Sequence, residues 1–195
     1  MKRKFAELAI EIKNCKACKL YNSRMNAVPG YGDTKAKLLF IGEAPGFEED
    51  KRGFPFIGKA GKLLDKILAS VQITREEVFI TNIIKCRPPG NRDPEQEEVR
   101  NCTPYLNRQI SLIRPKIICT LGRHSMHFFL GPKSGGISSI MGKWFKIELS
   151  SGEEIDLMPL FHPAYLLRNP TKRKGGPKSL TWSAIREVKK RLDTI

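Results

Sequence analysis

The sequence predicts an α/β fold, a three-layer α/β/α sandwich with a central, mainly parallel four-stranded sheet. Three short, continuous apolar runs predict its first strands, at Lys37–Gly42, Val78–Ile84 and Lys116–Gly122. Runs of this kind are typical of parallel strands, which are buried on both faces. Amphipathic helical patterns lie between the runs, and strands that alternate with helices indicate this fold class.

Amphipathic periodicity predicts the helices that cover the sheet. The expected helices are residues 1–14, Lys59–Val71, Arg92–Arg114, Arg123–Leu130 and Lys178–Leu192. The third begins with Asp93 as its N-cap and Pro94 at the first helical position, which are signals of a helix start. Two later segments, Lys143–Leu149 and Glu154–Leu160, flank a short turn and predict a hairpin that supplies the last strand of the sheet.

Length and composition limit the class of protein. With 195 residues, 40% of them apolar, the chain can bury one sizeable core, so we expect a single domain over residues 1–195. No stretch approaches the roughly 20 apolar residues that span a bilayer. Glu7 and Glu11 interrupt the apolar residues near the N-terminus, which is not typical of a signal peptide. We therefore expect a cytoplasmic protein without a membrane partner.

The chain is strongly basic. Lysine and arginine number 35 against 20 acidic residues, which gives a formal net charge of +15, and the excess is spread along the chain. Such a balance favours a polyanionic partner such as nucleic acid. A basic surface that only contacts solvent is the alternative interpretation, so charge alone does not decide between them.

Four of the five cysteines have the spacing of a metal centre. Cys15 and Cys18 form a C-x2-C pair after the first predicted helix, Cys86 follows the second strand, and Cys102 lies on the inward stripe of the next helix. Two close and two distant thiolates can bind either zinc or an iron-sulfur cluster, and spacing does not choose between them. The alternative is that these cysteines are small apolar core residues. Cys119 lies inside an apolar strand and fits that second role.

Polar motifs follow several predicted strands. GEAPG at Gly42–Gly46 comes directly after the first strand, Asn82 lies near the end of the second, and His162 follows the last one. In parallel sheets, binding sites form outside the carboxyl ends of the strands. We therefore expect these three groups to converge.

Two further patterns do not support other functions. Residues Gly53–Lys59 match the G-x4-G-K part of a phosphate loop, but Ala60 replaces the residue that would hold magnesium and no strand precedes the segment. A nucleotide triphosphatase is therefore not favoured. His124 and His127 lie three apart in a predicted helix without evident metal-ligand partners, so we assign them a structural or surface role.

Several motifs occur together in a fixed order. They are GEAPG with Glu48-Glu49-Asp50, PFIGKAG at Pro55–Gly61, TNIIKCRPP at Thr81–Pro89, HPAYLLRNP at His162–Pro170 and LTW at Leu180–Trp182. With the four cysteines, they make the chain similar to family 4 uracil-DNA glycosylases, the iron-sulfur branch of the uracil-DNA glycosylase superfamily. The resemblance covers nearly the whole chain. It implies the uracil-DNA glycosylase fold and a structural [4Fe-4S] cluster on Cys15, Cys18, Cys86 and Cys102.

The resemblance also implies an activity and roles for site residues. Such an enzyme flips uracil out of DNA, hydrolyses its N-glycosidic bond and leaves an abasic site for base-excision repair. Phe56 would stack on the uracil, Asn82 would read its edge, and His162 would stabilise the charge that develops on the departing base. Gly42 would line the base site with Glu43, which would stabilise the cationic sugar, position water or limit the space around the base.

One departure from another branch bears on mechanism. The best-known branch of the superfamily has an aspartate, thought to activate water, where this chain has Ala44. Family 4 also lacks this aspartate, so we expect catalysis to depend on stabilising the leaving group and the cation. No lysine is placed as an amine nucleophile, which indicates a monofunctional enzyme without strand cleavage.

The segment after His162 is expected to contact DNA. Leu166 or Leu167 would enter the base stack, and Arg168 would lie near a phosphate or the vacated space. The expected phosphate contacts are Lys172, Arg173 and Lys174. We expect a monomer that acts on uracil in single- or double-stranded DNA, and nothing in the sequence identifies a replication-clamp or polymerase partner.

Two other functions remain open from the residues alone. A non-catalytic iron-sulfur module that binds nucleic acid would keep the cysteines but would not need the intact set of Glu43, Asn82 and His162. A four-cysteine zinc protein that binds RNA would fit the charge, but it would leave GEAPG and HPAYLLRNP unexplained.

Overall fold

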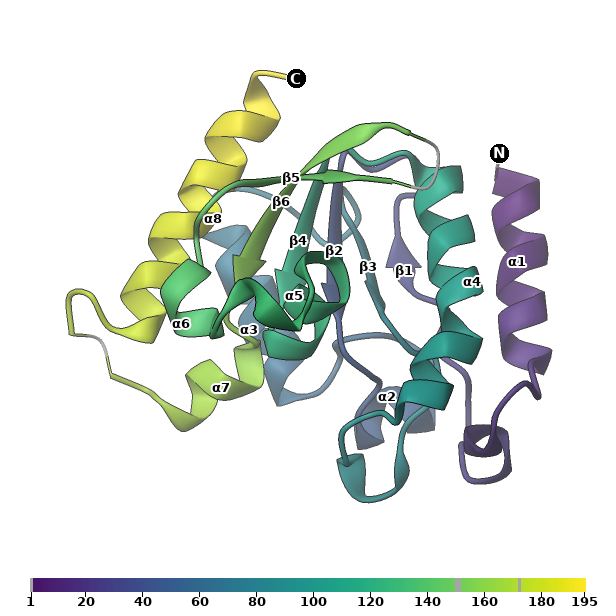
Figure 1. Ribbon diagram of the computed structural model, residues 1–195. Helices are drawn as coiled ribbons and strands as arrows, with labels where there is room; N and C mark the ends of the chain where they lie inside the picture. Colours follow the sequence, from purple (N-terminus) through teal and green to yellow (C-terminus); the bar gives the residue numbers. More distant parts are fainter. Residues whose placement is uncertain (1, 150–151, 172) are drawn as a thin grey trace.

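Figure 1 shows the computed structural model, which describes residues 2–149, 152–171 and 173–195. Its described strands are β1 (Tyr31–Gly32), β2 (Leu38–Gly42), β3 (Phe79–Asn82), β4 (Ile117–Leu121), β5 (Phe145–Glu148) and β6 (Glu154–Leu160). They form one sheet in the order β1-β3-β2-β4-β6-β5. The central strands β3, β2, β4 and β6 are parallel, and β1 and β5 pair antiparallel at the two edges.

The predicted fold class is confirmed, with one difference in strand number. The four parallel strands are those that the apolar runs and the hairpin predict, whereas the described sheet has six strands. The two additional strands are β5, the other arm of that hairpin, and β1. β1 has only two residues, too few to show any periodicity.

The helices occupy the two outer layers. They are α1 (Lys2–Asn14), α2 (Phe47–Arg52), α3 (Lys59–Ala69), α4 (Gln96–Ile113), α5 (Arg123–Leu130), α6 (Ile137–Ile140), α7 (Pro163–Arg168) and α8 (Pro177–Asp193). Helices α1 and α4 lie side by side in Figure 1, and α3 and α8 cover the opposite face of the sheet. No helix of the described residues is long and apolar enough to cross a membrane.

The N-cap predicted for α4 is wrong. The helix begins at Gln96, and its N-cap is Glu95, whose backbone N–H donates to the Glu98 carboxylate at 2.9 Å. This pairing is a capping box, and Glu98 is also held by a bidentate ion pair with Arg92. Asp93 therefore lies in the loop before the helix, where its carboxylate is free to make other contacts.

Alternate strand residues face the two helical layers. In β2, Phe40 packs in one core cluster with Leu64 of α3, whereas the preceding Leu39 packs in another with Leu106 of α4. This alternation follows from the two-residue period of a strand. Cys119 of β4 is fully buried in the first cluster, which agrees with its predicted role as a core residue.

The strand order places several turns at one edge of the sheet. Because β2, β3, β4 and β6 are parallel, their carboxyl ends, at Gly42, Asn82, Leu121 and Leu160, lie at the same edge. The chain after β2 leads to β3 on one side, and β4 pairs with β2 on the other. Such a switch in strand order opens a crevice at the carboxyl ends.

Candidate active site and metal centre

A cleft of about 450 Å³ opens at this edge of the sheet. Its walls come from the turn after β2, the segment before α3, the end of β3, the loop before α4 and the first residues of α5 and α7. The predicted residues Glu43, Phe56, Asn82 and His162 all line it. The structure therefore brings together groups that lie far apart in the sequence, as the strand-end argument predicts.

Asn82 supplies a buried acceptor that has no partner. The side chain is 1% exposed, and its Oδ1 atom makes no hydrogen bond to any described residue. An unpaired buried polar atom is costly, so it commonly marks a position where a ligand binds. A Cβ atom added to Gly42 would lie 2.4 Å from this oxygen and 2.6 Å from Cζ of Phe56. Glycine at position 42 thus allows the amide and the aromatic ring to pack directly against the end of β2.

The backbone below Asn82 is fixed by a buried lysine. The Lys85 ammonium donates to the main-chain oxygen of Asn82 at 2.6 Å and to the Thr81 hydroxyl at 2.8 Å. Burial lowers the pKa of Lys85 to about 8. These two bonds hold the end of β3, from which the Asn82 side chain enters the cleft.

Phe56 adopts an uncommon backbone conformation. Its φ angle of 51° lies in the left-handed region, and its carbonyl accepts a hydrogen bond of 2.8 Å from Arg75. The Phe56 carbonyl also packs so closely on Gly61 that no Cβ atom would fit there. The ring is only 5% exposed, and its centroid lies 5.7 Å from that of His162. Strain of this kind is typical of functional sites.

His162 is held as a neutral donor. Its Nδ1 atom accepts a hydrogen bond of 3.1 Å from the backbone N–H of Ala164, so the neutral ring carries its proton on Nε2. Burial lowers the pKa of His162 to about 4, and the positive charge of Arg168 acts in the same direction. At neutral pH the imidazole is therefore uncharged, with one N–H available to donate.

Glu49 connects the GEAPG turn to the segment before α3. Its carboxylate accepts hydrogen bonds from the backbone N–H groups of Gly46, Ile57 and Gly58, at 3.2, 2.9 and 2.9 Å. A phosphate loop would present the N–H groups of Ile57 and Gly58 to a ligand, but here both donate to Glu49. This agrees with the rejection of a phosphate-loop function for Gly53–Lys59.

Glu43 meets charged groups that sequence reasoning did not assign to the site. Burial raises the pKa of its carboxyl, and His124 partly offsets this effect. Asp93 and Arg123 also line the cleft, and the His124 Nε2 atom lies 3.8 Å from Oε2 of Glu43. Arg123 and His124 directly follow β4, so the rule that sites form at strand ends could have identified them.

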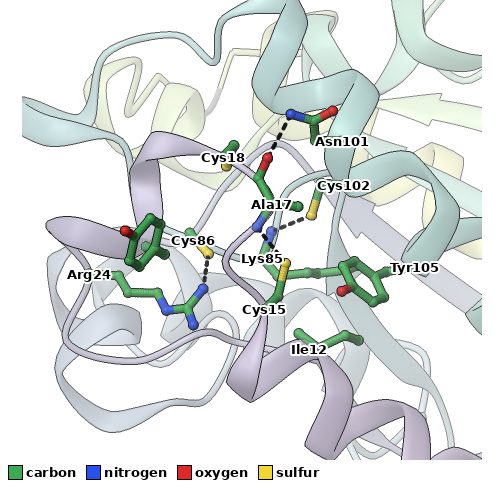
Figure 2. Close-up of a pocket in the computed structure, with 11 residues that line it drawn as sticks. Ile12, Cys15, Ala17, Cys18, Arg24, Lys85, Cys86, Asn101, Cys102 and Tyr105 are labelled. Carbon is green, nitrogen blue, oxygen red and sulfur yellow. Dashed lines mark hydrogen bonds between the residues drawn. The ribbon is translucent and has the colours of Figure 1, made fainter.

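The four predicted cysteine ligands line one pocket, shown in Figure 2. Cys15 and Cys18 follow α1, Cys86 follows β3, and Cys102 lies in α4. Three of the sulfurs accept hydrogen bonds: Cys15 from Ala17 N–H at 3.4 Å, Cys86 from the Arg24 guanidinium at 3.0 Å, and Cys102 from Lys85 N–H at 3.3 Å. Donors and a cation of this kind stabilise thiolate sulfur.

The sulfur atoms are widely spaced. Among the described residues, no three cysteine sulfurs lie within 4.8 Å of one another. A single tetrahedral zinc ion with Zn–S bonds near 2.3 Å would hold its ligands about 3.8 Å apart. Burial raises the pKa of Cys102 to about 11, although Lys85 opposes this shift. The described cysteines therefore do not form a ready-made tetrahedral site for a single ion.

The predicted DNA contacts differ in exposure. Leu166 is fully buried in the core cluster beneath α7, so the expectation that it enters a base stack is wrong. Leu167, the other predicted wedge residue, is 41% exposed. Arg168 is exposed and lines the cleft, and Arg173 and Lys174 are exposed. Lys172 lies outside the described residues.

Comparisons with known proteins show the family of the chain. The family model for the uracil DNA glycosylase superfamily matches residues 29–186. The chain belongs to this superfamily. It is 49% identical over 168 residues to the type-4 uracil-DNA glycosylase of Sulfurisphaera tokodaii, covering 84% of this chain and 76% of that protein. It is also 49% identical over 171 residues to the type-4 enzyme of Saccharolobus solfataricus, covering 86% and 79% of the two chains.

A third type-4 uracil-DNA glycosylase, from Archaeoglobus fulgidus, is 44% identical over 171 residues, which cover 86% of this chain and 85% of that protein. These identities place the chain with the type-4 members of the superfamily, as the resemblance implies. The part matched by the family model contains Glu43, Asn82 and His162, whereas Cys15 and Cys18 precede it. The uracil-DNA glycosylase superfamily is thus matched over the cleft as well as over the core sheet.

Proposed function

We propose that this chain is a monofunctional uracil-DNA glycosylase, which hydrolyses the N-glycosidic bond of uracil in DNA and leaves an abasic site. The observation that carries the proposal is the buried Oδ1 atom of Asn82, a residue that lines the cleft with Phe56; this atom has no hydrogen-bond partner among the described residues. The names of the type-4 relatives support the same activity.

Asn82 would distinguish uracil from cytosine. Its Oδ1 atom can accept from the imide N–H of uracil while its amide N–H donates to the adjacent carbonyl. Cytosine presents the opposite pattern at these two positions, so it would leave buried groups unpaired. The base must leave the stack to reach the cleft. This costs a few kcal/mol, and the cost is lowest when the base is mismatched. Phe56 would then lie against the face of the flipped base.

His162 and Glu43 would stabilise the two charges that form as the bond breaks. The Nε2–H group of a neutral His162 would donate to the uracil oxygen that becomes negative. The Glu43 carboxylate would face the cationic sugar and the water that adds to it. Water supplies hydroxide to the sugar carbon, and its proton balances the uracil anion. Because Ala44 has no carboxylate, the mechanism depends on these electrostatic effects rather than on an aspartate base.

The outer part of the cleft would bind DNA. Leu167 projects from α7 and is the candidate wedge, and Arg168 beside it would lie near a phosphate. Arg173 and Lys174 would add contacts that do not depend on sequence. The net charge of +15 favours the same polyanionic partner.

We also propose that Cys15, Cys18, Cys86 and Cys102 hold a [4Fe-4S] cluster. The support is their common pocket and the hydrogen-bond donors around the sulfurs, and no three of these sulfurs lie within 4.8 Å of one another among the described residues. When bound, the cluster would act as a structural cross-link between the end of α1, the segment after β3 and α4. Because Cys86 lies four residues after Asn82, this cross-link would support the base-reading strand.

Incubation with a uracil-containing oligonucleotide, followed by alkali, tests the activity. We expect alkali-dependent cleavage at the uracil from protein whose visible absorption confirms the cluster. Asn82→Ala should lower single-turnover excision more than DNA binding. No cleavage by protein with an intact cluster would refute the enzymatic function. Colourless protein with stoichiometric zinc would separately refute the cluster.

A further inference from the structure

A histidine and an aspartate outside the predicted catalytic set lie close to Glu43, which lines the cleft. The His124 Nε2 atom, at the start of α5, lies 3.2 Å from Oδ2 of Asp93 and 3.8 Å from Oε2 of Glu43. The Glu43 side chain is 27% exposed and that of His124 32%. Both are thus partly withdrawn from solvent, where such contacts are stronger than at a fully exposed surface.

We propose that His124, aligned by Asp93, is a positioning residue that holds Glu43 as an ionised carboxylate facing the sugar. This inference rests on the proposed uracil excision, because it assigns a partner to the acidic residue of that reaction. It concerns two residues that have no role in the mechanism described above. His124 acts through Glu43 and is not required to contact the substrate itself.

Hydrogen-bond geometry favours a proton on Nε2 of His124. Two carboxylate oxygens, from Asp93 and Glu43, lie near this nitrogen, and a carboxylate can only accept. The Arg123 guanidinium also lies 3.2 Å from Nε2 and would need that nitrogen to accept. Nε2 cannot donate to a carboxylate and accept from Arg123 at the same time. The Arg123 side chain is 58% exposed, so it can turn toward solvent when Nε2 carries the proton.

The surroundings of Glu43 otherwise favour its neutral form. Burial raises the pKa of Glu43, and Asp93 adds to that effect as a like charge, whereas His124 and Arg123 oppose it. The other charged or titratable groups that line the cleft are Glu49, Arg92, His162 and Arg168. Loss of His124 therefore moves Glu43 toward its neutral form, which cannot stabilise a cationic sugar.

The pH profile of excision tests this role. If the carboxylate of Glu43 is the active form, the rate falls as pH decreases through its pKa. Removing a group that lowers this pKa moves the acidic limb of the profile to higher pH. For His124→Gln we expect the acidic limb of single-turnover uracil excision to move to higher pH. The ratio of the wild-type rate to the variant rate should therefore increase as pH falls.

His127→Gln is a matched control on the same helix. His127 lies three residues further along the chain, and its Nε2 atom is 3.0 Å from the Gly135 carbonyl oxygen, whereas that of His124 is 3.8 Å from Glu43. Its profile should follow that of wild type. Thermal unfolding and visible absorption of both variants verify the fold, and His124→Asn serves as a second substitution with the same expected shift.

Three outcomes separate the possibilities. An active wild type with an unshifted profile in both His124 variants would overturn the role of His124 while leaving the glycosylase function intact. Wild-type excision that requires added Mg²⁺ or Zn²⁺, together with His124→Gln excision that the same metal no longer restores, would also overturn it. The Glu43, Asp93 and His124 ligand atoms, all within 4.8 Å of one another, would then form a metal site. An inactive wild type would refute the proposed function itself.

Discussion

Replacing Gly42 by alanine directly tests the shape of the base site. An added Cβ atom would lie 2.4 Å from Asn82 Oδ1 and 2.6 Å from Phe56 Cζ. Neither approach is possible without movement of the amide or the ring. Gly42 has no positive φ angle, so alanine introduces no backbone strain, and the effect comes from the contact alone. We expect the Asn82 amide to be displaced from the position in which it reads the base.

The size of the effect follows from the hydrogen bonds that are lost. A displaced amide would lose up to two bonds to the base, and leaving buried partners unpaired costs about 1–3 kcal/mol each. Losing both bonds would therefore cost about 2–6 kcal/mol, which corresponds to roughly 30- to 30,000-fold in rate. The fold should persist because the new methyl group affects only the lining of the cleft.

Single-turnover excision from a deoxyuridine oligonucleotide measures this loss. Affinity for the same oligonucleotide with an abasic site, which has no base to read, should change little. Gly136→Ala is the control, since its Cβ atom meets nothing within 4 Å and its φ angle is −76°. Two results would refute the assignment of this part of the cleft to the base. One is excision by Gly42→Ala at the wild-type rate, and the other is an affinity for the abasic oligonucleotide that falls as much as the excision rate.

Three further predictions concern the leaving group, the cluster and the DNA wedge. His162→Ala should lower single-turnover excision by about 10²–10³-fold, as loss of one oxyanion donor does. Because the pKa of His162 is about 4, the ratio of wild-type to variant rates should stay constant between about pH 6 and 8, and a ratio that changes there would contradict a neutral donor. Cys86→Ser should lower iron content, visible absorption and melting temperature together; unchanged iron would show that this sulfur is not a ligand. Leu166→Ala should destabilise the fold by about 2–5 kcal/mol in denaturant unfolding, since Leu166 is fully buried. Leu167→Ala should instead reduce excision from duplex DNA with little change in stability. If Leu167→Ala destabilised the fold and Leu166→Ala reduced excision alone, Leu166 would be the wedge and Leu167 the core residue.

The sequence alone indicated much of the fold and the site. Apolar runs located β2, β3 and β4, and the order of the motifs predicted that Glu43, Asn82 and His162 converge. These features depend on local patterns and on one topological rule, that the carboxyl ends of parallel strands share an edge. The cysteine spacing likewise indicated a common centre, although spacing left the choice of metal open.

Other features were decided only by the tertiary structure. Leu166 and Leu167 have the same side-chain chemistry, and only the packing of α7 on the core buries one and exposes the other. Asp93 looked like a helix cap, but Glu95 has that role, and the Asp93 carboxylate instead lies 3.2 Å from Nε2 of His124. A local pattern specifies which elements form, because their energetics depend on near neighbours. The direction in which a side chain points depends on how distant elements pack, and this is why the surroundings of Glu43 became visible only in the folded chain.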